Sequence, residues 1–141
     1  MILPDFKVFP RVGRVLGIDW GLRRIGVAVS DPSREFVFVR DVISVPRGAE
    51  NHADLVADMA RSENVVGIIV GVPVRGDGTE SDTTKMVRDF VAKLAIKTDL
   101  PICMIEENLT SATAQENMGR VRVRELKERL DYWEKYYICL Y

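Results

Sequence analysis

Asp19 is an isolated carboxylate within an apolar run. It lies in residues 14–32, RVLGIDWGLRRIGVAVSDP, where Val15, Leu16 and Ile18 predict a buried strand. A carboxylate that loses its water without gaining a partner costs several kcal/mol. Asp19 therefore needs a cation, a hydrogen-bond network or a catalytic role.

Three more acidic residues lie at the ends or edges of apolar segments. Glu106 and Glu107 end the apolar run of residues 101–106, and Asp131 lies beside the apolar stripe of the last helical segment. Converging carboxylates are the usual means of binding Mg²⁺, which prefers oxygen ligands. Two such ions can activate a water and stabilise the leaving oxygen in phosphodiester hydrolysis. A metal site that includes Asp19 is therefore one hypothesis.

Each of these acids also has a simpler explanation when it is taken alone. Asp19 can pair with one of the arginines that follow it in the sequence. Glu106 and Glu107 can form a solvated strand end, and Asp131, in RELKERLDYWEK, can be a charge on a helix surface. Only the combination of the four residues favours a metal site.

The elements that must position these residues alternate between strands and helices. Three strands with short connections predict antiparallel neighbours, and the helix–strand–helix–strand order that follows predicts parallel ones. We expect one α/β domain over residues 1–141, with a five-stranded mixed sheet whose first three strands are antiparallel and with helices on both faces. The expected strands are residues 14–20, 25–30, 37–45, 65–70 and 101–106, and the expected helices are residues 49–63, 81–97, 110–119 and 124 to near 141.

Composition restricts the class of protein. The chain has 141 residues and a formal net charge of −1, so no global positive field marks a nucleic-acid binder. Cys103 and Cys139 lie in apolar contexts without metal-ligand spacing and are expected to be buried thiols of a reducing cytosol. The single histidine, His52, receives no role. Without a signal peptide or a membrane-spanning run, we expect a cytoplasmic protein.

Several motifs together are similar to those of one family. LGIDWGLRRIGVAVSD resembles the opening signature of the YqgF/RuvX family, the Holliday-junction-resolvase-like proteins of the RNase H superfamily. VGVPVRGDGTES, IEENLTSATA and LDYWEKYYIC resemble later family segments in the same order. The resemblance implies an RNase H-like fold and a Mg²⁺- or Mn²⁺-dependent nuclease. It implies processing of the 5′ end of precursor 16S rRNA, with Holliday-junction resolution as the alternative.

The resemblance also assigns the site residues. Asp19 matches the catalytic Asp of the first strand, Glu106 or Glu107 matches the acidic pair after the fifth strand, and Asp131 matches the Asp of the last helix. Asp19, Glu107 and Asp131 are the expected metal ligands. Which Glu points into the site stays open, because adjacent strand residues face opposite sides. The sequence departs from the family at Asn108, where an Arg is usual.

A nuclease also needs basic residues to contact phosphates. Arg23 and Arg24 flank the turn after Asp19, and a second basic group precedes Asp131: Arg120, Arg122 and Arg124. The alternative explanation for this second group is that it forms the solvated start of a helix. The Gly71–Gly78 segment is expected to be a loop that can offer backbone N–H groups to phosphate.

Aromatic residues of the last helical segment, Trp133 and Tyr137 among them, are expected in the core or on a dimer surface, so a homodimer is a further expectation. Glu134 is either a fourth ligand or a solvated helix residue.

Three functions remain in competition at this point. The first is a metal-dependent nuclease on structured RNA or DNA. The second is a fragment of a sugar-kinase-like ATPase, which also opens with Gly-Ile-Asp-x-Gly but needs two lobes where 141 residues supply one. The third is a catalytically silent nucleic-acid-binding module of the same fold.

Overall fold

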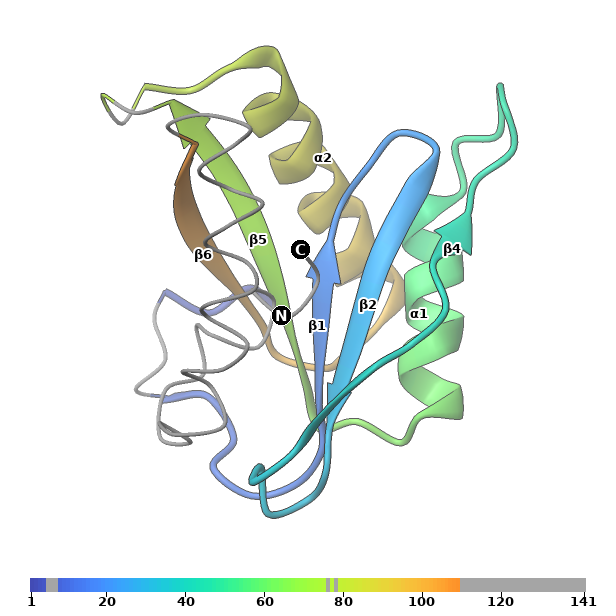
Figure 1. Cartoon of the computed structure of the whole chain (residues 1–141), viewed down its shortest axis with the longest axis vertical. Coiled ribbons are helices and arrows are strands. Elements are labelled where there is room, and N and C mark those ends of the chain that lie inside the picture. The colour runs from blue at the N-terminus through green and yellow to red at the C-terminus, as the bar shows by residue number, and fades with distance from the viewer. Residues whose placement is uncertain (5–7, 76, 78, 110–141) are drawn as a thin grey trace.

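The computed structural model describes residues 1–4, 8–75, 77 and 79–109, with the backbone alone at 107–109. Two helices and six strands follow one another along this part of the chain (Figure 1). They are β1 (Val15–Asp19), β2 (Arg24–Ser30), β3 (Val37–Val39), β4 (Ile43–Ser44), α1 (His52–Ser62), β5 (Gly67–Arg75), α2 (Asp82–Lys97) and β6 (Ile102–Leu109).

The described strands form one mixed sheet in the order β3-β2-β1-β5-β6, and β4 also pairs with β2. Strands β1, β2 and β3 are antiparallel neighbours. Strands β5 and β6 extend the sheet in parallel with β1. The predicted five-stranded path is therefore confirmed, with antiparallel pairing among the first three strands and parallel pairing on the other side. The carboxyl ends of the parallel strands β1, β5 and β6 meet at one edge of the sheet.

Each face of the sheet has its own apolar cluster. Leu16 and Ile18 of β1 belong to the larger cluster, together with residues of α1 and α2. Val15 belongs to a smaller cluster on the other face, together with the amino-terminal residues Leu3 and Phe9. This division follows from the alternation of side chains along a strand. It means that both described helices cover the same face.

The helices predicted over residues 110–119 and from 124 onwards lie outside the described residues, as does Cys139. Cys103 is buried in the smaller cluster, as predicted. None of the described helices is long and apolar enough to cross a membrane.

Helix α2 begins with a capping box that fixes its position beside β5. The Ser81 hydroxyl accepts a hydrogen bond from the Thr84 amide, and the Thr84 hydroxyl accepts one from the Ser81 amide. Thr84 Oγ1 also donates to the Pro73 carbonyl of β5 at 2.5 Å. Ser81 is therefore the cap of α2, because it has this reciprocal partner at Thr84.

Two predicted boundaries were wrong. The segment from Gly71 to Gly78 was expected to be a loop, but β5 continues to Arg75, which pairs with Leu109 of β6. Glycine and proline indicated a loop there, and the parallel pairing with β6 outweighs that local preference. The predicted strand 37–45 is two short strands, β3 and β4, which pair with different ends of β2.

Candidate active site and its surroundings

Asp19 is the last residue of β1, at the edge where the carboxyl ends of the parallel strands meet. Its neighbours across the sheet are Gly26 of β2 and Gly71 of β5. A residue directly opposite another on a neighbouring strand shares its face, so no neighbouring side chain stands beside Asp19 on β2 or β5. Asp19 is partly exposed, and it lies at the position where open α/β sheets bind ligands.

The face on which Asp19 lies follows from its position in β1. Leu16 and Ile18 point to the helices, so Val15, Gly17 and Asp19 belong to the opposite face. Gly71 pairs in turn with Ile105 of β6, which packs against the smaller cluster on that same face. Asp19 therefore lies in a row that runs across β2, β1, β5 and β6.

Glu106 lies on the face that the helices cover. It pairs with Val72, a member of the larger cluster, and its Oε1 is 3.6 Å from Nη2 of Arg88 on α2. Arg88 also donates a hydrogen bond to Glu80. The structure thus does not bring Glu106 and Asp19 together, although both came from the sequence as catalytic candidates.

The remaining predicted ligands are placed in part or not at all. Glu107 lies in β6 opposite Pro73, and its side chain is outside the described part of the chain, as is the whole of Asp131. Within the part that is described, no three His, Cys, Asp or Glu side chains gather in a way that could hold a metal ion. Arg120, Arg122 and Arg124 also lie outside the described residues, as do Glu134 and the aromatic residues Trp133 and Tyr137.

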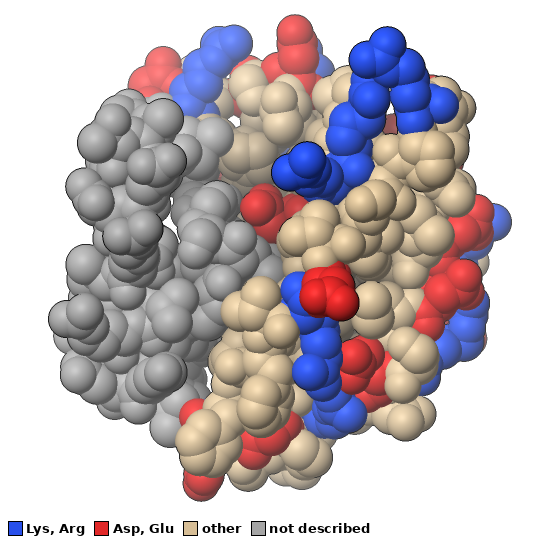
Figure 2. Space-filling view, turned by 45° about the vertical axis from the view of Figure 1, so that its right-hand side comes forward, with Lys and Arg blue, Asp and Glu red and all other residues tan. Residues whose placement is uncertain are grey.

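The two basic residues beside Asp19 are both exposed. Arg23 lies in the turn between β1 and β2, and Arg24 begins β2. The Val45 amide donates to the Arg23 carbonyl at 2.8 Å and so ties the turn to the segment after β4. Figure 2 shows basic side chains gathered at the upper right of the molecular face drawn there.

His52 connects this turn to α1, a role that the sequence did not indicate. Its Nε2 donates to the Leu22 carbonyl at 2.9 Å. Its ring stacks on Trp20, the residue after Asp19, with 5.3 Å between ring centroids and 30° between the planes. A single histidine with no other metal-ligand residue at a suitable spacing does not indicate a role in the sequence. Only its tertiary contacts show that it supports the turn.

The segment after β5 is closed by local hydrogen bonds. The Arg75 amide donates to the Thr79 carbonyl at 2.9 Å, and the Thr79 hydroxyl donates to the Asp77 carboxylate at 2.6 Å. Hydrogen bonds from the hydroxyl and amide of Thr79 hold the pKa of Asp77 below its usual value. Asp77 is therefore occupied with its own turn, at the same edge of the sheet as Asp19.

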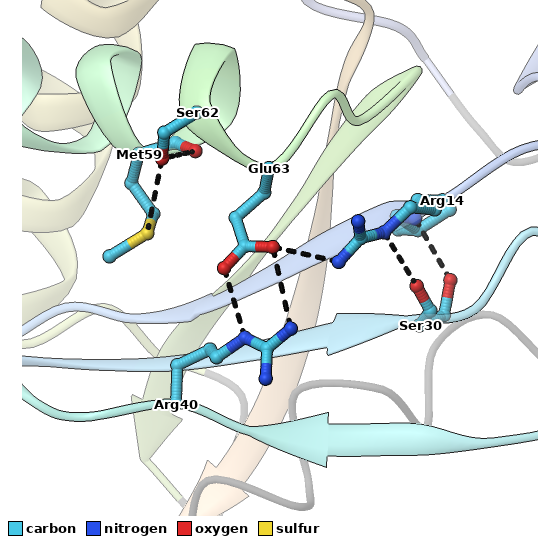
Figure 3. A network of polar contacts seen from close by, with 7 residues as sticks. Arg14, Ser30, Arg40, Met59, Ser62 and Glu63 are labelled. Carbon is cyan, nitrogen blue, oxygen red and sulfur yellow. Dashed lines mark hydrogen bonds and ion pairs between the residues drawn. The ribbon is translucent and has the colours of Figure 1, made fainter.

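Other charged residues gather at the opposite, amino-terminal edge of β1. Glu63, which follows α1, accepts hydrogen bonds from Arg14 at 2.7 Å and from Arg40 at 2.9 Å (Figure 3). The Ser30 hydroxyl accepts from the Val15 amide at 2.9 Å, next to the Arg14 side chain. These contacts join α1, β1, β2 and the segment after β3, and they are far along the strand from Asp19.

Residues 13–133 match the model of a family described as "RuvX: Holliday junction resolvase". The chain belongs to the RuvX family. A RuvX relative from Maridesulfovibrio salexigens, named "Putative pre-16S rRNA nuclease", is 34% identical over 84% of this chain and 88% of its own length. A relative of the same name from Rhodopirellula baltica is 36% identical over 87% of this chain and 72% of its own length.

A solved structure supports the fold of this RuvX chain. It is described as "T. thermophilus RuvC in complex with Holliday junction substrate". It matches with a TM-score of 0.52 and 9% identity, and the match covers 90% of this chain and 87% of that chain. The predicted RNase H-like α/β fold is thereby confirmed.

Proposed function

We propose that this RuvX protein is a nuclease that hydrolyses phosphodiester bonds in structured nucleic acid, with the 5′ end of precursor 16S rRNA as its substrate. The observation that supports this most directly is the position of Asp19 between Gly26 and Gly71, where the parallel strands end. Open α/β sheets bind ligands at this edge, outside the carboxyl ends of their strands. Family membership supplies the reaction class.

Asp19, Glu107 and Asp131 are proposed to hold Mg²⁺ or Mn²⁺. Arg88 lies beside Glu106 on the helix-covered face, and neighbouring strand positions alternate between faces, so position 107 shares the face of Asp19. The donor set consists of hard carboxylate oxygens, which suits these ions. When bound, the metal would activate a water and neutralise charge on the phosphate.

The protein's own residues would then orient the substrate. Arg23 and Arg24, on the turn after Asp19, are proposed to contact phosphates flanking the bond that is cut. Holliday-junction DNA is the second candidate substrate, because the family model and the fold neighbour are both described by that junction. A catalytically silent binding module is the outcome if neither substrate is cut.

Cleavage of a labelled precursor 16S rRNA fragment and of a four-way DNA junction tests the proposal. Activity should appear with Mg²⁺ or Mn²⁺ and disappear with EDTA. Asp19→Asn and Glu107→Gln should each lower the rate by a factor of about 10² or more, equal to about 3 kcal/mol of barrier. Glu106→Gln is the matched control, since the same change one residue away affects only the contact with Arg88.

The outcomes separate the alternatives. Retained activity in Glu106→Gln together with loss of activity in Glu107→Gln supports Glu107 as the metal ligand. The reverse result would show that the metal lies on the other face. Equal cleavage by wild type and Asp19→Asn would point to a contaminating nuclease.

A further inference from the structure

Two cavities adjoin each other beside the turn that follows Asp19. One has a volume of about 150 Å³ and lies between this turn, the start of α1 and the middle of α2. The other has a volume of about 170 Å³ and lies between the turn and the segment before α1. Leu22, Glu50 and His52 line both, so the two cavities are compartments of one groove. Each compartment suits a small group rather than a whole drug-sized ligand.

The compartment between the turn and the segment before α1 is basic. Arg23 and Arg47 line it from two different loops, and both are exposed. Among the described residues, neither arginine forms an ion pair with an acidic side chain. Glu50 is the one acid that lines this compartment, so the positive charge prevails. A pair of guanidinium groups is well suited to a phosphate.

The compartment between the turn, α1 and α2 is largely apolar and aromatic. Its lining includes Trp20, Met86 and Phe90, with the His52 ring stacked on Trp20. Its charged members are Glu50 and the pair of Lys93 with Asp89, whose atoms are 3.1 Å apart. Aromatic and apolar surfaces bind nucleobases through stacking, whatever the base.

On the basis of the proposed nuclease function, we infer that this groove binds one nucleotide of the substrate strand, on the helix-covered face beside the turn after Asp19. The phosphate lies against Arg23 and Arg47, and the base enters the compartment of Trp20 and Phe90. Trp20 follows Asp19 directly and packs against the larger cluster, so the groove lies on the helix-covered face, beside the end of β1. His52 then serves as a positioning residue, because its bond to Leu22 holds the wall between the compartments.

Binding of a labelled ten-nucleotide single-stranded RNA, measured by fluorescence anisotropy without divalent metal, tests the phosphate compartment. Arg47→Ala should weaken binding about tenfold and reduce the slope of log affinity against log salt by about 1. The matched control is Arg61→Ala on α1, which removes an exposed arginine paired with Asp58 and should leave affinity unchanged. Unchanged affinity in Arg47→Ala would overturn the inference.

The base compartment is tested through the ring resonances of His52, the single histidine of the chain, in NMR titrations. AMP, CMP, GMP or UMP should shift these resonances more than ribose 5-phosphate at the same concentration. Equal shifts would show that the base does not enter the compartment, and no shift with any of them would exclude nucleotide binding in the groove.

Cleavage assays separate failure of the groove from failure of the proposed function. If wild type binds RNA and responds to mononucleotides but cuts neither substrate, the nuclease proposal fails while the groove stands. If wild type cuts, Arg47→Ala should raise KM. If Arg47→Ala cuts with the same KM and binds RNA with the same affinity as wild type, nucleotide binding in the groove is contradicted and the nuclease proposal is unaffected.

Discussion

At the scale of single residues, Glu63 and Asp19 are two carboxylates in different surroundings: the first stabilises the fold, and the second is the proposed metal ligand. Glu63 has 17% of its side chain exposed and accepts hydrogen bonds from two arginines (Figure 3). Asp19 lies between two glycines, so the adjacent positions of β2 and β5 carry no side chain. The first arrangement restrains the chain, and the second is the one at which we propose that a metal binds.

Glu63→Gln should destabilise the protein by about 2 kcal/mol, because charge-assisted hydrogen bonds to Arg14 and Arg40 are lost at a largely buried site. Urea unfolding followed by circular dichroism measures the change. Asp58→Asn is the control, since its pair with Arg61 is exposed and should be worth less than about 0.5 kcal/mol. Similar losses in the two variants would contradict this account of Glu63.

At the scale of elements, the start of α2 connects helix geometry to the candidate site. The cap of α2 involves Thr84, which is buried and also donates to the Pro73 carbonyl of β5. Pro73 is the cross-strand neighbour of Glu107. The same side chain therefore sets where α2 begins and supports the strand that adjoins the proposed metal ligand.

Ser81→Ala should reduce the free energy of unfolding by about 1 kcal/mol, because the Thr84 amide loses its capping acceptor. Thr83→Ala, at an exposed position of the same turn, should change it by less than about 0.5 kcal/mol. Chemical denaturation of both variants measures the difference. Equal stability of Ser81→Ala and wild type would mean that the capping box does not contribute.

The order of elements was largely predictable, since apolar alternation and helical periodicity are local signals. The length of β5 was not, because Gly71 and Pro73 are ordinary in loops, and only pairing with β6 keeps them extended. The proposal of Glu107 rather than Glu106 as the metal ligand also needed the strand register and the position of Arg88 on α2. The place of Asp19 on the first strand could be predicted, because a carboxylate in an apolar run is conspicuous, and its role stays a prediction. The groove beside His52 could not, because its walls come from four separate segments.

At the scale of the whole molecule, the amino-terminal residues complete the layer opposite the helices. The Leu3 amide donates to the Ile102 carbonyl at 2.8 Å, and Phe9 is buried against the sheet. A Cβ added at Gly67 of β5 would come within 2.5 Å of Cζ of Phe9. The segment before β1 is therefore fitted to the sheet with little spare room.

A double-mutant cycle tests this fit. Gly67→Ala should cost about 1 to 3 kcal/mol of stability, because the added methyl group overpacks the Phe9 ring. In a Phe9→Leu background the same change should cost less than about 0.5 kcal/mol, since the ring is gone. Thermal and urea unfolding of the four proteins give the coupling. Additive effects would show that the two residues do not meet in solution.

The short strand β3 has a consequence for behaviour at high concentration. It ends the order of the described strands, has three residues, and exposes Phe38 and Val39. Immediately after it comes Arg40, whose guanidinium is bonded to Glu63 and lies 5.8 Å from the centre of the Phe38 ring. An edge strand of three residues offers a second molecule few backbone groups to pair with. A positive charge beside that strand disfavours pairing further. Self-association through this side of the sheet, and the precipitation that would follow, are thereby discouraged.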